Sequence, residues 1–150
     1  MHIRLYALKD KAHCVDIFKS NCPEYLDPRE FAQFESFLDS DVLENYFVIE
    51  DHGEIVGCGG FDIYQKKNEG RLTWGLVHKN YHKKGYGKAL FEFRFREIRK
   101  ALQKKKNIHI SLETSQKTYR FFEKLGFKVI DIAKDFYGKE LDKYTMELKK

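Results

Sequence analysis

The sequence is poor in cysteine and proline, with only 3 and 2 of these residues in 150. Cys14, Cys22 and Cys58 are too few and too scattered for a disulfide framework. No two of them have the spacing of metal ligands, so we predict no metal site. Cys58 lies between glycines in a predicted strand, and we expect its side chain to be packed rather than nucleophilic.

Long hydrophobic runs are also missing, since no apolar stretch approaches the roughly 20 residues that a membrane span requires. The first residues, from Met1 to Arg4, lack the apolar core of a secretory signal. We therefore expect a cytoplasmic protein with no membrane partner.

Hydrophobic residues make up 42% of the chain and aromatic residues 15%, which excludes a disordered chain and is enough for a packed interior. A length of 150 residues suits one domain, which we place at residues 1–150. The formal net charge is +5. This excess of positive charge is compatible with a nucleic-acid partner or with an anionic cofactor.

The most informative stretch is the polar loop that joins an apolar strand, Leu72 to Val77, to a long helical pattern. Gly85 and Gly87 stand where the loop becomes the helix. Glycine there allows a positive φ and close approach of another molecule to the main chain. The first amides of a helix point outward at the positive end of its dipole, so the turn is a candidate anion site. Basic side chains surround it at Lys83, Lys84 and Lys88.

The spacing of this loop excludes two common phosphate-binding motifs. A Walker loop needs Ser or Thr after Gly87-Lys88, where the chain has Ala89. A Rossmann fingerprint needs a third Gly at the position of Leu90.

The sequence His-Lys-Lys-Gly-Tyr-Gly at residues 82–87, after a strand ending in Val77, resembles the Gln/Arg-x-x-Gly-x-Gly/Ala signature of the GNAT superfamily of N-acetyltransferases. A second block is similar to the family as well: Leu-Glu-Thr-Ser at residues 112–115, then Phe-Phe-Glu-Lys-Leu-Gly-Phe at residues 121–127. The resemblance covers roughly residues 46 to 148. It implies an enzyme that moves the acetyl group of acetyl-CoA to a primary amine of a small molecule or peptide.

The resemblance also implies where acetyl-CoA binds. Its pyrophosphate would lie on the loop, its thioester carbonyl on main-chain amides at the end of the preceding strand, and its pantetheine arm between two splayed strands, 72–77 and 107–112. The implied cofactor-binding residues are Leu76, Val77, His82, Lys83, Lys84, Gly85, Tyr86, Gly87, Lys88, Ser115, Thr118 and Phe122.

The attacking amine must lose a proton, because a lysine-like amine with a pKa of about 10.4 is mostly protonated at neutral pH. Glu113 ends the second splayed strand and is the first candidate for the base. The alternative is that Glu113 only stabilises the following helix as an acidic residue near its N-terminus.

The departing CoA thiolate would gain from a proton donor, for which the family often uses a Tyr seven residues after an Asn. This chain has Phe122 and Ser115 at those positions. Tyr119 and Tyr137 are the candidate substitutes, and the spacing of Ser115, Thr118 and Phe122 predicts one helix face toward the cofactor. Two alternatives stay open: a CoA-binding module without catalysis, and, ranked last, a basic nucleic-acid-binding protein.

The pattern predicts an α/β (α+β) fold, with a mixed, twisted β-sheet flanked by helices on both faces. Asp27, Pro28 and Glu30 predict a helix start with a capping box. The resemblance implies that the region from Cys14 to Asn45 forms one wall of the acceptor site. The link at residues 136–142 is long enough to fold over a cleft. A homodimer paired through the last strand is an open alternative. The predicted strands are 3–6, 46–50, 55–63, 72–77, 107–112, 127–132 and 143–148; the helices are 10–19, one from Asp27, one after Gly87, and 116–125.

Overall fold

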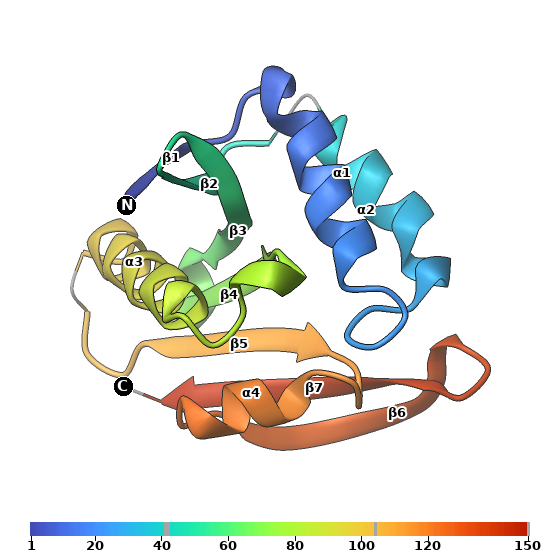
Figure 1. The fold of residues 1–150 in the computed structure, drawn as a ribbon. Helices are drawn as coiled ribbons and strands as arrows, with labels where there is room; N and C mark the ends of the chain where they lie inside the picture. Colours follow the sequence, from blue (N-terminus) through green and yellow to red (C-terminus); the bar gives the residue numbers. More distant parts are fainter. Residues whose placement is uncertain (41–42, 104, 150) are drawn as a thin grey trace. The chain divides into compact units, whose positions relative to one another are not determined.

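The computed structural model describes residues 1–40, 43–103 and 105–149, so Asp41 and Val42 of the predicted acceptor wall lie outside the described residues. The predicted order of strands and helices is confirmed (Figure 1). The strands are β1 (His2–Leu5), β2 (Tyr46–Asp51), β3 (Glu54–Tyr64), β4 (Glu69–Val77), β5 (His109–Thr114), β6 (Lys128–Gly138) and β7 (Leu141–Lys149). The helices are α1 (Lys11–Ser20), α2 (Phe31–Leu38), α3 (Tyr86–Ala101) and α4 (Tyr119–Lys124), with short 3₁₀ turns η1 (Leu8–Asp10), η2 (Pro28–Glu30), η3 (Gln65–Lys67) and η4 (Lys79–Tyr81).

The strands form a mixed sheet in the order β1-β2-β3-β4-β5-β7-β6. The β4–β5 pair is parallel, whereas β1–β2, β2–β3, β5–β7 and β6–β7 are antiparallel. A mixed sheet combined with helices is the fold class that the sequence predicts. In the part of the chain that the structure describes, no helix is both long and apolar enough to cross a membrane.

Contacts divide the chain into two compact units, and β3, β4 and α3 each contribute residues to both. Unit 1 comprises residues 1–60 and 74–93, and unit 2 comprises residues 61–73 and 94–150.

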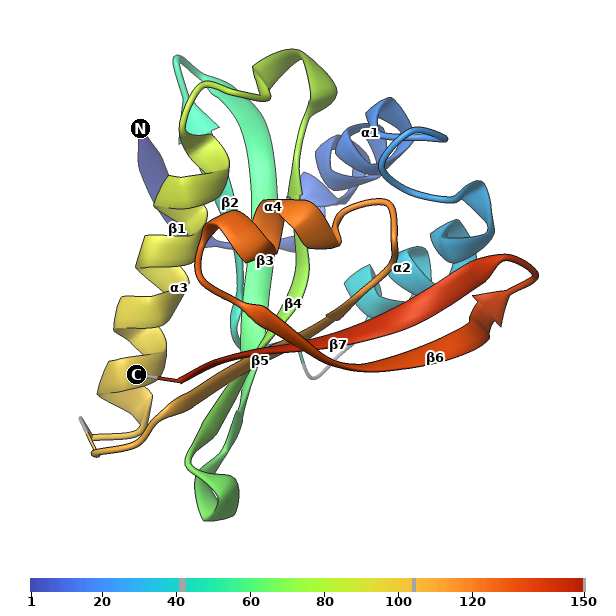
Figure 2. The same ribbon diagram turned by 90° about the horizontal axis from the view of Figure 1, so that it is seen from below.

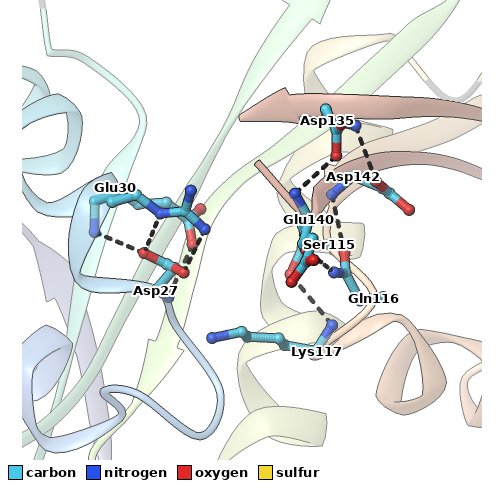
Figure 3. Close-up of polar contacts among 9 residues, drawn as sticks. Asp27, Glu30, Ser115, Gln116, Lys117, Asp135, Glu140 and Asp142 are labelled. Carbon is cyan, nitrogen blue, oxygen red and sulfur yellow. Dashed lines mark hydrogen bonds and ion pairs between the residues drawn. The ribbon is translucent and has the colours of Figure 1, made fainter. Parts of the chain in front are cut away.

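Unit 1 packs α1 and α2 on a buried aromatic cluster that includes Phe18, Phe34 and Tyr46. The rings of Phe18 and Phe34 stack at 5.3 Å, and the Tyr46 hydroxyl donates to the Trp74 carbonyl at 2.7 Å. The predicted capping box is confirmed, since the Asp27 carboxylate accepts from the Arg29 amide and Glu30 accepts from the Asp27 amide (Figure 3).

Unit 2 is built on β5, β7 and β6, and Figure 2 shows α4 beside this part of the sheet. Its buried residues include Ile110, Leu112 and Met146. Parallel pairing of β4 with β5 runs only from Glu69 to Arg71 among the residues described in this unit. This short register agrees with the predicted splaying of the two strands.

Three sequence-based expectations about unit 2 are wrong. Helix α4 begins at Tyr119 and not near residue 116, because the Ser115 hydroxyl accepts from the Lys117 amide and holds a turn there. Residues 136–142 do not form a long link, because β6 extends to Gly138 and β7 starts at Leu141. The last strand, β7, cannot pair across a dimer, because β5 and β6 occupy both of its edges.

Candidate active site

The glycine loop, residues 82–88, lies between β4 and α3 and runs into the helix. Two of its residues adopt the left-handed backbone conformation. The φ angles are +61° for Lys83 and +89° for Gly85. A Cβ added at Gly85 would meet nothing within 4 Å, so the main chain there is open to an approaching molecule. Among the described residues, no acceptor binds the amides of Lys83, Lys84 or Gly85. Those donors and the first turn of α3 are therefore available to an anion.

The three lysines of the glycine loop are exposed, and no acidic side chain of the described chain pairs with them. The Lys84 ammonium lies 5.5 Å from the centre of the Tyr81 ring. Gly87 is already helical, so only Gly85 of the two glycines uses a positive φ. The predicted loop is thus confirmed in conformation, and its donor set fits a pyrophosphate.

Two tyrosines fasten the glycine loop to the β2–β3 hairpin. The Tyr86 hydroxyl donates to Asp51 at 2.5 Å, and the Tyr81 hydroxyl donates to Glu54. The hydrogen bond to Asp51 raises the pKa of Tyr86 and lowers the pKa of Asp51, while the bond to Glu54 raises the pKa of Tyr81. Both hydroxyls are therefore used in holding the loop, and Tyr86 could serve a cofactor through its main chain.

The end of β4 is held by side-chain donors on its last carbonyl. The Val77 oxygen lies 2.9 Å from His82 Nε2 and accepts from Asn21 Nδ2 at 3.0 Å. Leu76 is buried, and a Cβ at Gly57 would come within 3.0 Å of the Leu76 oxygen. Two strands thus approach closely where the sequence predicts the thioester carbonyl to bind.

Asn21 is a site residue that the sequence reasoning missed. It is only 4% exposed, and its amide group also donates to the Ile17 carbonyl at 2.8 Å. Its contact with Val77 spans 56 positions of the chain, and no motif links the two.

Further contacts join the end of α1 to the loop that follows β4. The Ser20 hydroxyl accepts from the Lys79 amide at 3.1 Å, and Glu24 pairs with Lys79 at 3.1 Å. The Tyr25 ring meets the His82 ring edge-on at 4.9 Å. We call Asn21 and these neighbours, Ser20, Glu24 and Tyr25, the α1 turn. It fixes the position of the chain from Val77 to His82.

The backbone of β4 is irregular three residues before Val77. Trp74 has a φ of +38°, which a bulky residue rarely adopts in a strand. Its ring is packed 5.0 Å from Phe34. Such local strain is found most often at functional sites. No sequence pattern indicates this conformation, because Trp favours regular strands.

Glu113, the candidate base, lies inside β5 in unit 2 and is partly exposed. Its carboxylate is 3.2 Å from Lys143 Nζ and 4.0 Å from Arg71 Nη1. It therefore does not act as a helix-end charge, because Tyr119, where α4 starts, is six positions further on. To act as a base, the Glu113 carboxylate would have to accept a proton while it is paired with Lys143 and Arg71.

The other candidates of unit 2 lie between β5 and the β6–β7 hairpin. Ser115 is buried, and the hydroxyl of Thr118 pairs with that of Thr114. The Tyr119 ring lies 4.7 Å from Tyr144, and Phe122 packs on Phe127 at 5.9 Å. Because Ser115 and Thr118 precede α4, the predicted helix face of Ser115, Thr118 and Phe122 is wrong for both of them.

Tyr137 lies in β6 and not in a loop. The hairpin that carries it is fastened by Gln116, which donates to the Glu140 carbonyl at 2.6 Å and accepts from the Asp142 amide at 3.0 Å (Figure 3). Asp135 accepts from the Glu140 amide at 2.7 Å in the same network. The structure thus brings Glu113, Ser115, Thr118, Tyr119, Phe122 and Tyr137 into one unit, and the residues from Leu76 to Lys88 into the other.

The model of the acetyltransferase (GNAT) domain family matches residues 43–129, more than half of the chain. No curated protein sequence matches this chain.

Three solved structures share the fold over nearly the whole chain. Ard1 from Thermoplasma volcanium is 22% identical, with a TM-score of 0.77, covering 99% of this chain and 96% of that chain. A ribosomal-protein alanine N-acetyltransferase from Escherichia coli is 19% identical, with a TM-score of 0.76 and coverage of 99% and 92%. An aminoglycoside 6'-N-acetyltransferase complexed with coenzyme A is 17% identical, with a TM-score of 0.72 and coverage of 99% and 97%.

Proposed function

The chain belongs to the GNAT acetyltransferase domain family, acyl-CoA-dependent enzymes whose co-substrate is acetyl-CoA, and we propose that it acetylates a primary amine of a small molecule or peptide by direct attack. The observation that carries the proposal is the glycine loop, with its open main chain at Gly85, the unbonded amides of residues 83–85 and three exposed lysines that no acidic side chain of the described chain pairs with. The similar structures named for N-acetyltransferases support an amine as the acceptor.

In the proposed reaction the neutral amine nitrogen attacks the thioester carbonyl carbon, and the carbon–sulfur bond breaks. An amide forms, the CoA thiolate departs, and the amine proton is lost. The main-chain amides of Leu76 and Val77 are the proposed donors to the developing oxyanion. The firm hold of Asn21 and His82 on the Val77 carbonyl supports this role, because oxyanion donors act best when fixed beforehand.

We assign the pyrophosphate to the amides and lysines of the glycine loop, with His82 at the start of the loop. Ser115, Thr118 and Phe122 are the proposed residues along the pantetheine arm. Two separate groups of the chain would thus bind acetyl-CoA. The splayed strands β4 and β5 lead to them. Residues 1–150 would then act as one domain, since β3, β4 and α3 belong to both units.

Glu113 is the proposed proton acceptor, and bulk water is the alternative, because its carboxylate is already engaged by Lys143 and Arg71. Tyr119 and Tyr137 are the proposed donors to the thiolate. A thiolate is a good leaving group, so the Phe at position 122 is compatible with turnover.

The experiment that tests the function is thiol release from acetyl-CoA with a panel of amines, including peptides with a free N-terminus and aminosugars. We expect release that depends on the acceptor. Tyr119→Phe and Tyr137→Phe, assayed with the best acceptor, identify the acid: a loss of about a hundredfold in one of them would assign it. Tight CoA binding without turnover on any amine would contradict the proposed acceptor class.

A cytoplasmic location and a homodimer also belong to the proposal. In a dimer, β6 would be the pairing strand, because it is the edge of the sheet and exposes Ile130 and Ile132. Sedimentation of the purified protein tests the oligomeric state.

A further inference from the structure

Two basic segments of unit 2 meet at the tip of the β3–β4 hairpin. Gln65 Nε2 donates to the Ala101 carbonyl at 3.1 Å, and Lys105 Nζ donates back to Gln65 Oε1 at 3.4 Å. Asn68 Nδ2 donates to the Lys106 carbonyl at 2.7 Å and to the Asn107 carbonyl at 3.2 Å. The hairpin tip is therefore tied to the end of α3 and to the loop before β5.

These contacts join two segments that carry six cations, which we call the basic patch: Lys66, Lys67, Arg99, Lys100, Lys105 and Lys106. Among the described residues of the two segments that form it, 64–68, 97–103 and 105–107, the acidic one is Glu97, which pairs with Lys100 at 3.1 Å. None of the other five cations has an acidic partner among the described residues. The six cations and Glu97 together carry a net charge of +5, and the formal net charge of the whole chain is also +5.

Neutral side chains hold the basic patch together. Asn68 adopts a left-handed φ of +54°, and its amide bridges two carbonyls of the facing loop. Gln65 makes the second link. These contacts involve none of the ammonium groups of Lys66, Lys67 and Lys106, and all three residues are exposed. A surface that gathers unpaired like charges at an electrostatic cost is suited to an anionic partner.

An exposed aromatic ring stands beside the cations. Tyr64 is 39% exposed, with the Arg71 guanidinium 5.3 Å and the Lys67 ammonium 6.0 Å from its ring centre. Proteins that bind single-stranded nucleic acids combine cations that follow the phosphates with aromatic rings on which bases stack.

We propose that the basic patch binds the phosphate backbone of a single-stranded nucleic acid, as a function separate from acetyl transfer. The patch lies at the C-terminal end of the 16-residue α3, whereas the glycine loop precedes the N-terminal end of that helix. The two anion-binding features thus use different ends of α3, and the patch does not depend on the acetyl-CoA assignment.

The test is fluorescence anisotropy with a labelled oligouridine of about 16 nucleotides. With five cations engaged, the logarithm of the affinity should fall with that of the salt concentration with a slope of about −3.5, or about a hundredfold from 50 to 200 mM. The triple variant Lys66→Gln, Lys67→Gln, Lys106→Gln should reduce the slope by about 2 and the affinity at least tenfold. The matched control, Lys9→Gln, Lys124→Gln, Lys128→Gln, removes the same charge from exposed positions elsewhere and should change the affinity less than threefold.

Tyr64→Ala sharpens the assignment, since loss of stacking should weaken oligouridine binding about tenfold and leave a duplex of the same length unaffected. Acetyl-CoA binding by each variant checks that it is folded. The proposal is overturned if the wild-type protein does not bind oligouridine, if the control triple loses as much affinity as the patch triple, or if vesicles containing anionic lipid bind and the oligonucleotide does not.

Discussion

The glycine loop of unit 1 and the segment from Glu113 to Phe122 of unit 2 are the two regions that match the family's motifs, and their polar groups are in opposite states. In the glycine loop, no acceptor of the described chain binds the amides of Lys83, Lys84 and Gly85, and no acidic side chain there pairs with the three lysines. In the other segment the polar groups are engaged: Glu113 with Lys143, Thr118 with Thr114, and Ser115 with the Lys117 amide. The first region is ready for an external anion, whereas the second would have to exchange internal contacts for external ones.

The difference follows from how each region works. Binding a pyrophosphate depends on main-chain amides and on a glycine conformation, and neither changes with the neighbouring side chains. Moving protons depends on single side chains and their surroundings, which vary within one fold. Substitutions in the glycine loop should therefore affect binding strongly. Those in the second region should act on the rate and leave CoA affinity unchanged.

The largest effect is expected for Gly85→Glu. It places a side chain and a negative charge in the open space beside the loop amides, at a φ of +89°. Affinity for CoA, measured by calorimetry, should fall by about a hundredfold or more. Gly53→Glu is the matched control, because Gly53 has a φ of +77° and equally open surroundings in the β2–β3 turn. It carries the same backbone strain and should bind CoA normally; equal losses in both variants would show that strain, and not the site, is responsible.

The next effect is expected for Asn21→Asp. A carboxylate replaces the amide donor beside the Val77 oxygen, so an attraction at 3.0 Å becomes a repulsion. If Val77 must be held for catalysis, kcat should fall about tenfold or more, with little change in CoA affinity, because leaving a buried acceptor poorly satisfied costs about 1–3 kcal/mol.

The control is Asn80→Asp, at an exposed position of η4. Asn21→Ser tests partial rescue, since a hydroxyl can still donate. A lower melting temperature for Asn21→Asp with unchanged kcat would mean that the α1 turn stabilises the fold without positioning the reaction.

The sequence predicted the loop and missed the α1 turn for a physical reason. Gly85 and the lysines act within a few residues of one another, so their role is encoded locally. Asn21 meets Val77 across 56 positions, and a buried Asn after a helix looks like an ordinary C-terminal cap until the fold brings β4 to it. The same holds for Trp74, whose strained backbone is imposed by packing against Phe34 and Tyr46.

The errors in unit 2 were local in origin. Ser115 and Thr118 were assigned to a helix, but their hydroxyls bond to nearby groups and hold a turn, a competition that helical periodicity does not reveal. The β6–β7 hairpin was predicted too short because Phe136 and Tyr137 were placed in the turn. Gln116 closes the actual turn through Glu140 and Asp142.

A smaller effect is expected for Glu113→Gln. The substitution keeps the shape of the side chain but removes the proton acceptor and its ion pairs with Lys143 and Arg71. As the base, Glu113 should show a fall in rate of about tenfold to a hundredfold that is most severe at low pH, with unchanged CoA affinity. Glu123→Gln, at an exposed position of α4, is the control. A wild-type pH–rate profile in the Glu113 variant would assign the proton to water and leave Glu113 as an ion-pair partner only.

The smallest effect is expected for Phe122→Tyr, which tests whether the missing tyrosine matters. Phe122 is half-buried, and its ring contacts Phe121 at 5.2 Å and Phe127 at 5.9 Å, in a cluster below the first turn of α4. An added hydroxyl should be tolerated, because the ring is not enclosed. If it reaches the sulfur, thiol release should rise a few-fold; if not, the rate and the CoA affinity should equal those of the wild type.

Phe127→Tyr is the matched control for Phe122→Tyr, since it adds the same hydroxyl to the buried partner ring and should lower stability without raising the rate. A large loss of rate in Phe122→Tyr would contradict this reading. It would mean that the phenyl ring itself excludes water from the thioester, and that the acid is supplied elsewhere, with Tyr119 and Tyr137 as the side chains to test.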